Sequence, residues 1–179
     1  TKGETSKDLK FNNLLVELRE NESLFKLLIP WFLNCLANAF PMLLFVFFVT
    51  SILNGTEEEK ELILFLYFLS ALLGMAFWVL LIKYIEKKDI WRLSMTISSL
   101  VFVFVFFLET GNIIYFLIIS CLTGFCLGAD LAIPPSMLSD VTDYHKKKFK
   151  SDISGLLFSM MILINKLTFA LATLVAFSI

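Results

Sequence analysis

The chain has 179 residues, of which 58% are hydrophobic and 17% are charged, and its formal net charge is −1. A soluble domain carries about 45–50% apolar and about 25% charged residues, so this composition excludes an ordinary soluble protein. The charges are segregated along the chain instead of forming a basic surface, and we expect no nucleic-acid partner. The composition predicts an all-α protein whose helices cross a lipid bilayer.

Residues 1–23 form a polar segment ahead of the first apolar run. The chain begins with Thr1, and no signal-peptide pattern precedes that run, so we expect it to be a piece of a longer protein. Within "DLKFNNLLVELRENESLFKLL", Leu14, Leu15 and Leu18 recur at helical spacing. They predict an amphipathic surface helix leading into the first membrane span.

Five apolar segments are long enough to cross a bilayer, which requires about 20 mostly apolar residues in a helix. In chain order they are Leu24–Leu53, Leu62–Ile82, Ile90–Leu108, Ile113–Leu138 and Ile153–Ile179. Pro30 and Pro41 interrupt the first span, which we expect to be kinked or to start late. Residues 24–179 are therefore predicted to be a helical bundle.

Basic residues alternate between the connections and so predict the orientation. They occur before or at the start of the first span, in the second connection and in the fourth: Lys2, Lys7, Lys10, Arg19 and Lys26; Lys83, Lys87, Lys88 and Arg92; Lys146, Lys147, Lys148 and Lys150. The first and third connections hold only Lys60. This positive-inside pattern predicts a cytoplasmic amino-terminal end, with Trp78 and Trp91 as interfacial anchors beside the second connection.

Two ionisable residues lie deep inside predicted spans, where such groups usually face a cavity or a partner. Lys166 is about 13 residues into the last span, or ~20 Å from its start, too deep for its side chain to reach the interface. Asp130 is ten residues before Asp140, or ~15 Å deeper. We expect Asp130 and Lys166 to face the same cavity and to pair there; a purely structural ion pair is the alternative.

Asn34 and Asn38 are four residues apart and therefore share one helix face. Their amides are candidates for binding a polar solute, and hydrogen bonding to a neighbouring helix is an equal alternative. His145 is the only histidine and follows a hydrophobic run in a lysine-rich stretch, where we expect it in a solvated loop. It does not converge with carboxylates at ligand spacing, so no metal site is predicted.

The stretch "AIPPSMLSDVTDYHKKKFK" marks the end of the fourth span, with Ile133–Leu138 as its last residues. Asp140 and Asp143 follow on one face of the chain near a negative helix terminus and require cations nearby. The lysines of the second and fourth connections are the candidates. Solvated charge that only sets the topology is the simpler interpretation of this region.

The same features resemble a known family. "PPSMLSDVTDY", the basic stretch after it and a lysine deep in the next helix resemble the glycoside–pentoside–hexuronide:cation symporters, the melibiose-carrier-like branch of the major facilitator superfamily. The family's D-x-x-D-Y is matched by Asp140, Asp143 and Tyr144, and its helix-eleven lysine by Lys166. "LRENESLFKLL" and "YFLSALLGMAFWVLLIKYIEKKDIWRL" resemble its seventh and eighth helices. Asp152 stands where the family usually carries an arginine.

The resemblance implies that the five spans are helices seven to eleven of twelve, in the carboxy-terminal half of a transporter whose last helix is missing here. It implies alternating access, with Lys166 near the substrate and a cytoplasmic gate at Asp140, Asp143 and Tyr144. The coupling cation, sodium or a proton, would be bound mainly by the amino-terminal half, which is absent from this chain. No other cofactor is expected, and the location implied is the bacterial cytoplasmic (inner) membrane.

The leading functional hypothesis is part of a cation-coupled symporter for a small polar solute such as a sugar, in contact with lipid and with its own amino-terminal half. A lipid or amphiphile carrier of the same fold is the alternative within transport. A non-transporting membrane scaffold or truncated half-transporter is the alternative outside it. An enzyme is disfavoured, because no nucleophile–base pair, phosphate loop or metal cluster is visible.

Overall fold

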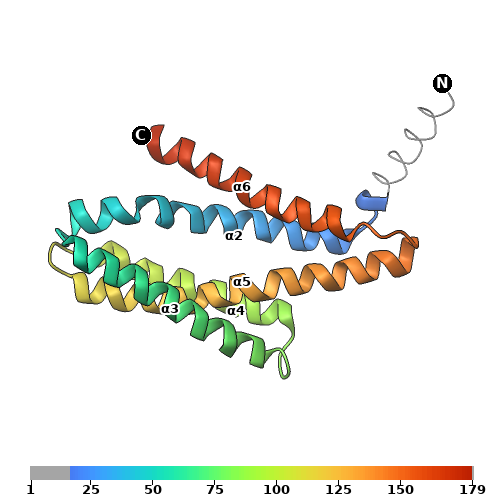
Figure 1. Ribbon diagram of the computed structural model, residues 1–179, viewed down its shortest axis with the longest axis horizontal. Coiled ribbons are helices and arrows are strands. Elements are labelled where there is room, and N and C mark those ends of the chain that lie inside the picture. Colours follow the sequence, from blue (N-terminus) through green and yellow to red (C-terminus); the bar gives the residue numbers. More distant parts are fainter. Residues whose placement is uncertain (1–16, 179) are drawn as a thin grey trace.

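The computed structural model describes residues 17–178, and this part of the chain is helical with no β-strand (Figure 1). In order, the elements are α2 (Glu22–Phe47), the π-helix η1 (Phe48–Ile52), α3 (Glu57–Leu81), α4 (Lys87–Val103), the 3₁₀-helix η2 (Phe104–Phe107), α5 (Ile113–Phe149) and α6 (Ser154–Ser178). The five long helices are long and apolar enough to span a membrane. The predicted all-α, five-span architecture is confirmed.

The surface helix predicted within residues 1–23 lies largely outside the described part of the chain. Residues 17–19 of that segment are helical, and the chain leaves the helix before Asn21. Asn21 is the N-cap of α2, where its side-chain oxygen accepts a hydrogen bond from the Leu24 amide. This N-cap therefore fixes the residue at which the first membrane helix starts.

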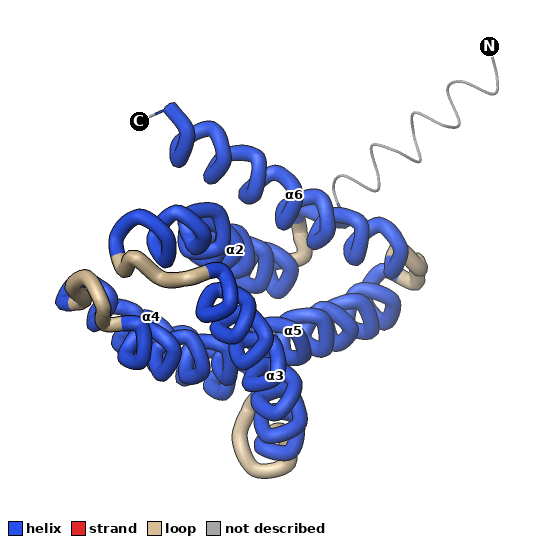
Figure 2. Tube along the Cα trace, turned by 60° about the vertical axis from the view of Figure 1, so that its left-hand side comes forward, coloured by secondary structure: helices blue, strands red, loops and turns tan. Residues whose placement is uncertain are grey.

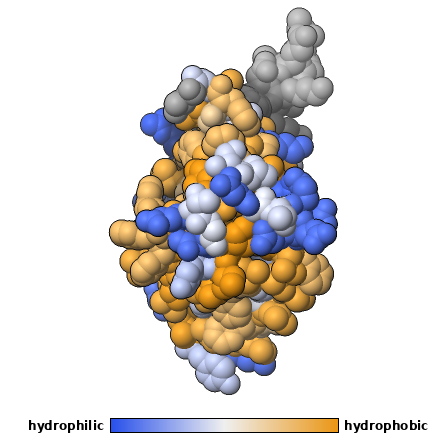
Figure 3. Space-filling view, turned by 90° about the vertical axis from the view of Figure 1, so that its left-hand side faces the viewer, coloured by the Kyte–Doolittle hydropathy of each residue, from blue (hydrophilic) through white to orange (hydrophobic). Residues whose placement is uncertain are grey.

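The long helices pack in two groups. α6 lies along α2, while α3 and α4 both pack against α5 (Figures 1 and 2). Viewed from one end, the bundle presents hydrophilic residues at its tip and a hydrophobic surface around its sides (Figure 3). An apolar side surface is what a bundle embedded in lipid requires, because hydrocarbon does not penalise exposed leucine or phenylalanine.

Two hydrophobic clusters hold the bundle together. The larger one joins α2, α3, α4, α5 and α6 and includes Leu24, Trp78, Ile90, Ile133 and Leu157. The smaller one lies around the opposite end of α2 and contains Val49, Leu53, Ile63 and Phe116. Along α2, the stretch that carries Asn34 and Asn38 therefore lies between the two clusters.

The contact between α3 and α5 depends on glycine. A Cβ atom on Gly128 would lie 2.5 Å from the Ala71 carbonyl oxygen and 2.6 Å from the Gly74 carbonyl carbon, and it would also collide with the Met75 amide nitrogen. Gly124, one turn earlier, meets the backbone of Tyr67 in the same way. Glycines four residues apart let two helix backbones approach closely, which is how membrane helices gain packing energy without a hydrophobic driving force.

Two expectations about where helices begin and end were wrong. α2 runs as one helix from Glu22 through Pro30 and Pro41, so the first span does not start late. The fourth span does not finish at Leu138, because α5 continues through Pro134 and Pro135 to Phe149. Membrane helices tolerate proline because neighbouring groups satisfy the carbonyls that lose their partners. The lysines at 146–148 form the last turn of α5, where positive charge complements the negative helix terminus.

The expected interfacial role of the two tryptophans was also wrong. Trp78 and Trp91 are 3% and 5% exposed. The indole N–H of Trp78 donates to the Phe125 carbonyl of α5 at 2.9 Å, and that of Trp91 donates to Asp130. Both rings pack inside the bundle because each N–H finds a partner on α5 instead of at the membrane–water interface.

Candidate functional site

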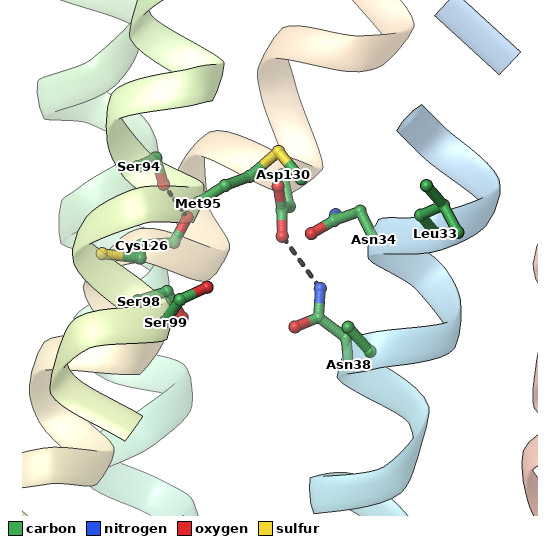
Figure 4. Close-up of a pocket in the computed structure, with 10 residues that line it drawn as sticks. Leu33, Asn34, Asn38, Ser94, Met95, Ser98, Ser99, Cys126 and Asp130 are labelled. Carbon is green, nitrogen blue, oxygen red and sulfur yellow. Dashed lines mark hydrogen bonds between the residues drawn. The ribbon is translucent and has the colours of Figure 1, made fainter. Parts of the chain in front are cut away.

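Asp130 is the centre of the candidate site and lies near the middle of α5. Its Oδ1 accepts a hydrogen bond from Trp91 Nε1 of α4 at 2.7 Å, and its Oδ2 accepts one from Asn38 Nδ2 of α2 at 3.0 Å (Figure 4). Asn34, one turn before Asn38, also points toward the carboxyl group. Three helices thus converge on one carboxylate, and the two N–H donors offset part of the cost of placing it within the membrane.

A cavity of about 240 Å³ opens beside this carboxylate. All three helices contribute polar residues to its wall, alongside apolar ones; the polar residues are Asn34 and Asn38, Ser94, Ser98 and Ser99, and Asp130. Because Asn38 Nδ2 is directed at Asp130, its Oδ1 is turned toward the serine side of the cavity (Figure 4). The cavity offers amide, hydroxyl and carboxylate groups within a space suited to a small polar ligand.

Lys166 occupies a different position. It is the middle residue of α6, which packs on α2, and its side chain is exposed. Within residues 17–178 it takes part in no ion pair, whereas Asp130 is held by Asn38 and Trp91. The structure therefore brings Asp130, Asn34 and Asn38 together and does not form the Asp130–Lys166 pair expected from their similar depth.

The predicted gate residues lie on the last turns of α5. Asp140 Oδ2 forms an ion pair with Lys87 Nζ of α4 at 2.6 Å, and the same ammonium group approaches the Ser136 carbonyl at 3.4 Å. Lys87 was one of the predicted cation candidates. Asp143 and Tyr144 are exposed, and Asp143 forms no ion pair within the described range. Asp140 is thus the anchored member of the two aspartates.

The turn between α5 and α6 is organised by Asp152. Its Oδ1 accepts hydrogen bonds from the Ser154 hydroxyl at 2.6 Å and the Ser154 amide at 3.2 Å, and its Oδ2 pairs with Lys146 Nζ at 2.9 Å. Two hydrogen bonds keep the pKa of Asp152 below its usual range. The larger effect comes from the Ser154 hydroxyl, and the next from Lys146. The residue that departs from the family pattern therefore caps the start of α6.

His145 is not in a solvated loop, as its sequence context suggested. It lies on α5 and its side chain is fully buried, between the N-cap of α2 and the turn at Ser151. The mistake follows from ending the fourth span at Leu138, which placed every later residue in water. Across residues 17–178, no group of three or more histidine, cysteine, aspartate or glutamate side chains could hold a metal ion.

Sequence reasoning missed the contribution of α4 to the site. Trp91 was assigned to the interface, and Ser94, Ser98 and Ser99 were not considered. Ser94 and Ser98 are four residues apart, the same spacing that singled out Asn34 and Asn38, so they share one face of α4. Polar residues repeating at this spacing in an apolar helix were the available signal.

A protein-family model described as MFS/sugar transport protein matches residues 2–179. No curated protein and no solved structure matches the chain.

Proposed function

The chain belongs to the MFS/sugar transport protein family, an integral membrane transporter family, and from this premise we propose that it forms part of a cation-coupled symporter for a small polar solute such as a sugar. Transport would proceed by alternating access, with sodium or a proton as the coupling cation. Within the superfamily we assign it to the melibiose-carrier-like branch, on the match of Asp140, Asp143, Tyr144 and Lys166 to that branch's motifs.

The observation that carries the proposal is the cavity around Asp130, with the polar side chains that three helices contribute to it. An ionisable residue in a membrane span marks a substrate or ion pathway by default. Here the carboxylate lies beside amides and hydroxyls from α2 and α4. At about 240 Å³, the part of the cavity formed by these helices has room for a small polar solute or for the polar part of a larger one.

The remaining parts of the proposal concern partners and location. We assign solute binding or coupling to Asp130, Asn34, Asn38 and Lys166, with most of the coupling-ion site contributed by an amino-terminal half of the same transporter. The alternating lysines support an orientation with the end of α5 in the cytoplasm, and hence a cytoplasmic membrane location. A lipid carrier and a non-transporting scaffold remain as competing functions for the experiment to separate.

The direct test is uptake by the full-length transporter in proteoliposomes under an inward sodium gradient, a proton gradient or neither. We expect one gradient to drive accumulation of a labelled mono- or disaccharide. Asp130→Asn, which keeps the size of the side chain, should reduce accumulation at least about tenfold, because a hydrogen bond to a charged group contributes about 1.5–3 kcal/mol. Gradient-independent uptake of a lysophospholipid alone would support the lipid carrier, and folded protein that takes up neither would support the scaffold.

The gate can be tested at the ion pair between α4 and α5. Asp140→Asn should favour the cytoplasm-open state about two- to fivefold, since a partly exposed ion pair contributes about 0.2–1 kcal/mol. The readout is the labelling rate of Ser98→Cys from the cytoplasmic side, in a background where the native cysteines are replaced by serine: Cys35, Cys121 and Cys126.

Asp143→Asn is the matched control, because it removes the same charge from an exposed position without breaking an ion pair of the described chain. The exchange Lys87→Asp with Asp140→Lys should return labelling toward the original rate. Labelling of the Asp140 and Asp143 variants at the original rate would show that these aspartates act only on topology, and equally raised labelling would show that the gate does not depend on the Lys87–Asp140 pair.

A further inference from the structure

A buried polar network joins four parts of the chain at the end of α5. His145 is 0% exposed, and its ring packs against Phe149 in a tilted arrangement with 4.6 Å between the ring centroids. Its Nδ1 lies 3.3 Å from Asn21 Nδ2, and its Nε2 lies 3.2 Å from Ser151 Oγ and 3.4 Å from Glu17 Oε2. The network connects residue 17, the N-cap of α2, the last turns of α5 and the turn before α6.

The N-cap of α2 fixes which way the Asn21 amide faces. Asn21 Oδ1 accepts the Leu24 amide hydrogen at 3.2 Å, so the Nδ2 group is the one turned toward His145. An amide nitrogen donates hydrogen bonds and does not accept them, so His145 Nδ1 must present a lone pair. This arrangement of heavy atoms fits a neutral imidazole that carries its hydrogen on Nε2.

The other side of the ring agrees with this tautomer. The Ser151 hydroxyl donates to Glu17 Oε2 at 2.7 Å, which leaves the hydroxyl oxygen free to accept from the Nε2–H of His145. Every polar atom of the ring then has a complementary partner, as a fully buried imidazole requires. Because Nε2 donates to Ser151, His145 does not act as a base toward that hydroxyl.

We propose that His145 is a proton-operated clasp, which as the neutral Nε2–H tautomer ties the end of α5 to the N-cap of α2 and opens when Nδ1 takes a proton. With hydrogens on both nitrogens, Nδ1 faces the hydrogens of the Asn21 amide. Asn21 either turns its side-chain oxygen to His145, leaving the Leu24 amide with only the Asn21 backbone carbonyl as acceptor at 3.0 Å, or keeps the cap and loses the bond to His145. The cap and the clasp cannot both survive protonation.

The charged groups around the ring determine which states compete. Glu17, in the segment before α2, stabilises the imidazolium across Nε2. On α5, Lys148 lies over Phe149, the residue that packs against His145, and opposes a second positive charge there. Glu22 at the start of α2 pairs with Lys26, and Asp152 of the turn pairs with Lys146, so both acids are already engaged.

The clasp follows from the contacts of His145 alone. Only its exposure to the pH of the cytoplasm depends on the proposed orientation of the chain in the membrane. Histidine is the side chain whose charge ordinarily changes between pH 5 and 8, so acidification of that compartment is the stimulus. Opening the clasp breaks the link between Asn21 and the last turns of α5, while Glu17 stays bound to Ser151 in the α5–α6 turn. The regulated event is thus the relative movement of the N-cap of α2 and the cytoplasmic end of α5.

The tautomer can be read directly by ¹⁵N NMR of the full-length protein in bilayers, labelled on histidine, purified without a histidine tag and assigned by the signal lost in His145→Gln. We expect widely separated Nδ1 and Nε2 shifts with the hydrogen on Nε2 at neutral pH. Asn21→Asp keeps an oxygen for the Leu24 amide but offers Nδ1 an acceptor, so it should raise the pH at which the ring becomes doubly protonated. An Nδ1–H tautomer in the unaltered protein, or an unchanged titration in Asn21→Asp, would overturn the proposal.

Amide hydrogen exchange tests the consequence for α2. The Leu24 amide donates to the Asn21 side-chain oxygen and also to the Asn21 backbone carbonyl, at 3.2 and 3.0 Å, so the side chain supplies part of its protection. The Glu59 amide of α3 donates to the N-cap side chain of Thr56, on a helix that has no contact with His145 among those described, and serves as the reference. The ratio of their exchange rates cancels the general effect of pH. On protonation of His145 we expect the ratio of Leu24 to Glu59 exchange to rise about fivefold, as loss of an N-cap predicts. A ratio that stays constant through the titration contradicts the clasp, whether or not the protein transports a solute.

Discussion

Replacing Gly128 with alanine is expected to separate α3 from α5 and to destabilise the whole bundle. The added Cβ would press on the Ala71 carbonyl, the Gly74 carbonyl carbon and the Met75 amide, all of which are backbone atoms that have no rotamer to change. Overpacking of this kind costs about 1–3 kcal/mol. Thermal unfolding of the purified protein, followed by loss of the monodisperse peak in gel filtration, measures the effect.

Gly155→Ala supplies the matched control. Gly155 lies in the first turn of α6, where a Cβ atom meets no heavy atom within 4 Å, and alanine there gains helix propensity. It should leave the midpoint of thermal unfolding unchanged or slightly raised. If Gly128→Ala and Gly155→Ala unfold at the same temperature, the close approach of α3 and α5 does not stabilise the bundle.

Replacing Lys166 with leucine is expected to abolish solute accumulation while leaving membrane insertion intact. A lysine at the centre of a membrane helix costs about 2.5–3.5 kcal/mol on insertion scales, so leucine should insert at least as well. Within residues 17–178 the ammonium group has no ion-pair partner that would explain its presence structurally. We therefore expect uptake to fall at least about tenfold, the loss of one hydrogen bond to a charged group.

Lys147→Leu is the control for lost charge, because Lys147 is exposed in the last turn of α5, away from the middle of any helix. It should retain uptake. The exchange of Asp130 and Lys166 should not restore transport, because Asp130 is held by Asn38 and Trp91 and not by Lys166. Normal accumulation by Lys166→Leu would remove this residue from the transport mechanism.

The five spans could be predicted because bilayer thickness and hydropathy act on each segment separately. The length of α5 could not, since two prolines followed by two aspartates look like a helix end in isolation. What carries the helix past Pro134 and Pro135 is contact with other elements, including the Lys87–Asp140 pair and the burial of Leu138 and His145. These contacts form only once distant segments have packed.

The site was predicted only in part, because its contacts also form only once distant segments have packed. Depth along a helix comes from counting residues, and it singled out Asp130 and Lys166, while the four-residue spacing on one helix face singled out Asn34 and Asn38. The rotation of a helix about its own axis decides which side chains face one another, and that rotation depends on packing. Gly124 and Gly128 turn one face of α5 to α3, which leaves Asp130 facing Trp91 and Asn38 and not α6. Similar depth was therefore a poor guide to pairing.

Because α5 is unusually long, a small tilt of this helix displaces its end by a large distance. At 1.5 Å per residue its 37 residues extend about 55 Å, well beyond the ~30 Å of the hydrocarbon layer. Asp130 is near its midpoint, and the end at Phe149 is about 28 Å away, so a tilt of about 10° around the ligand cavity displaces that end by about 5 Å. A small rearrangement at the carboxylate is thus magnified at Asp140 and His145, where the ion pair and the clasp lie.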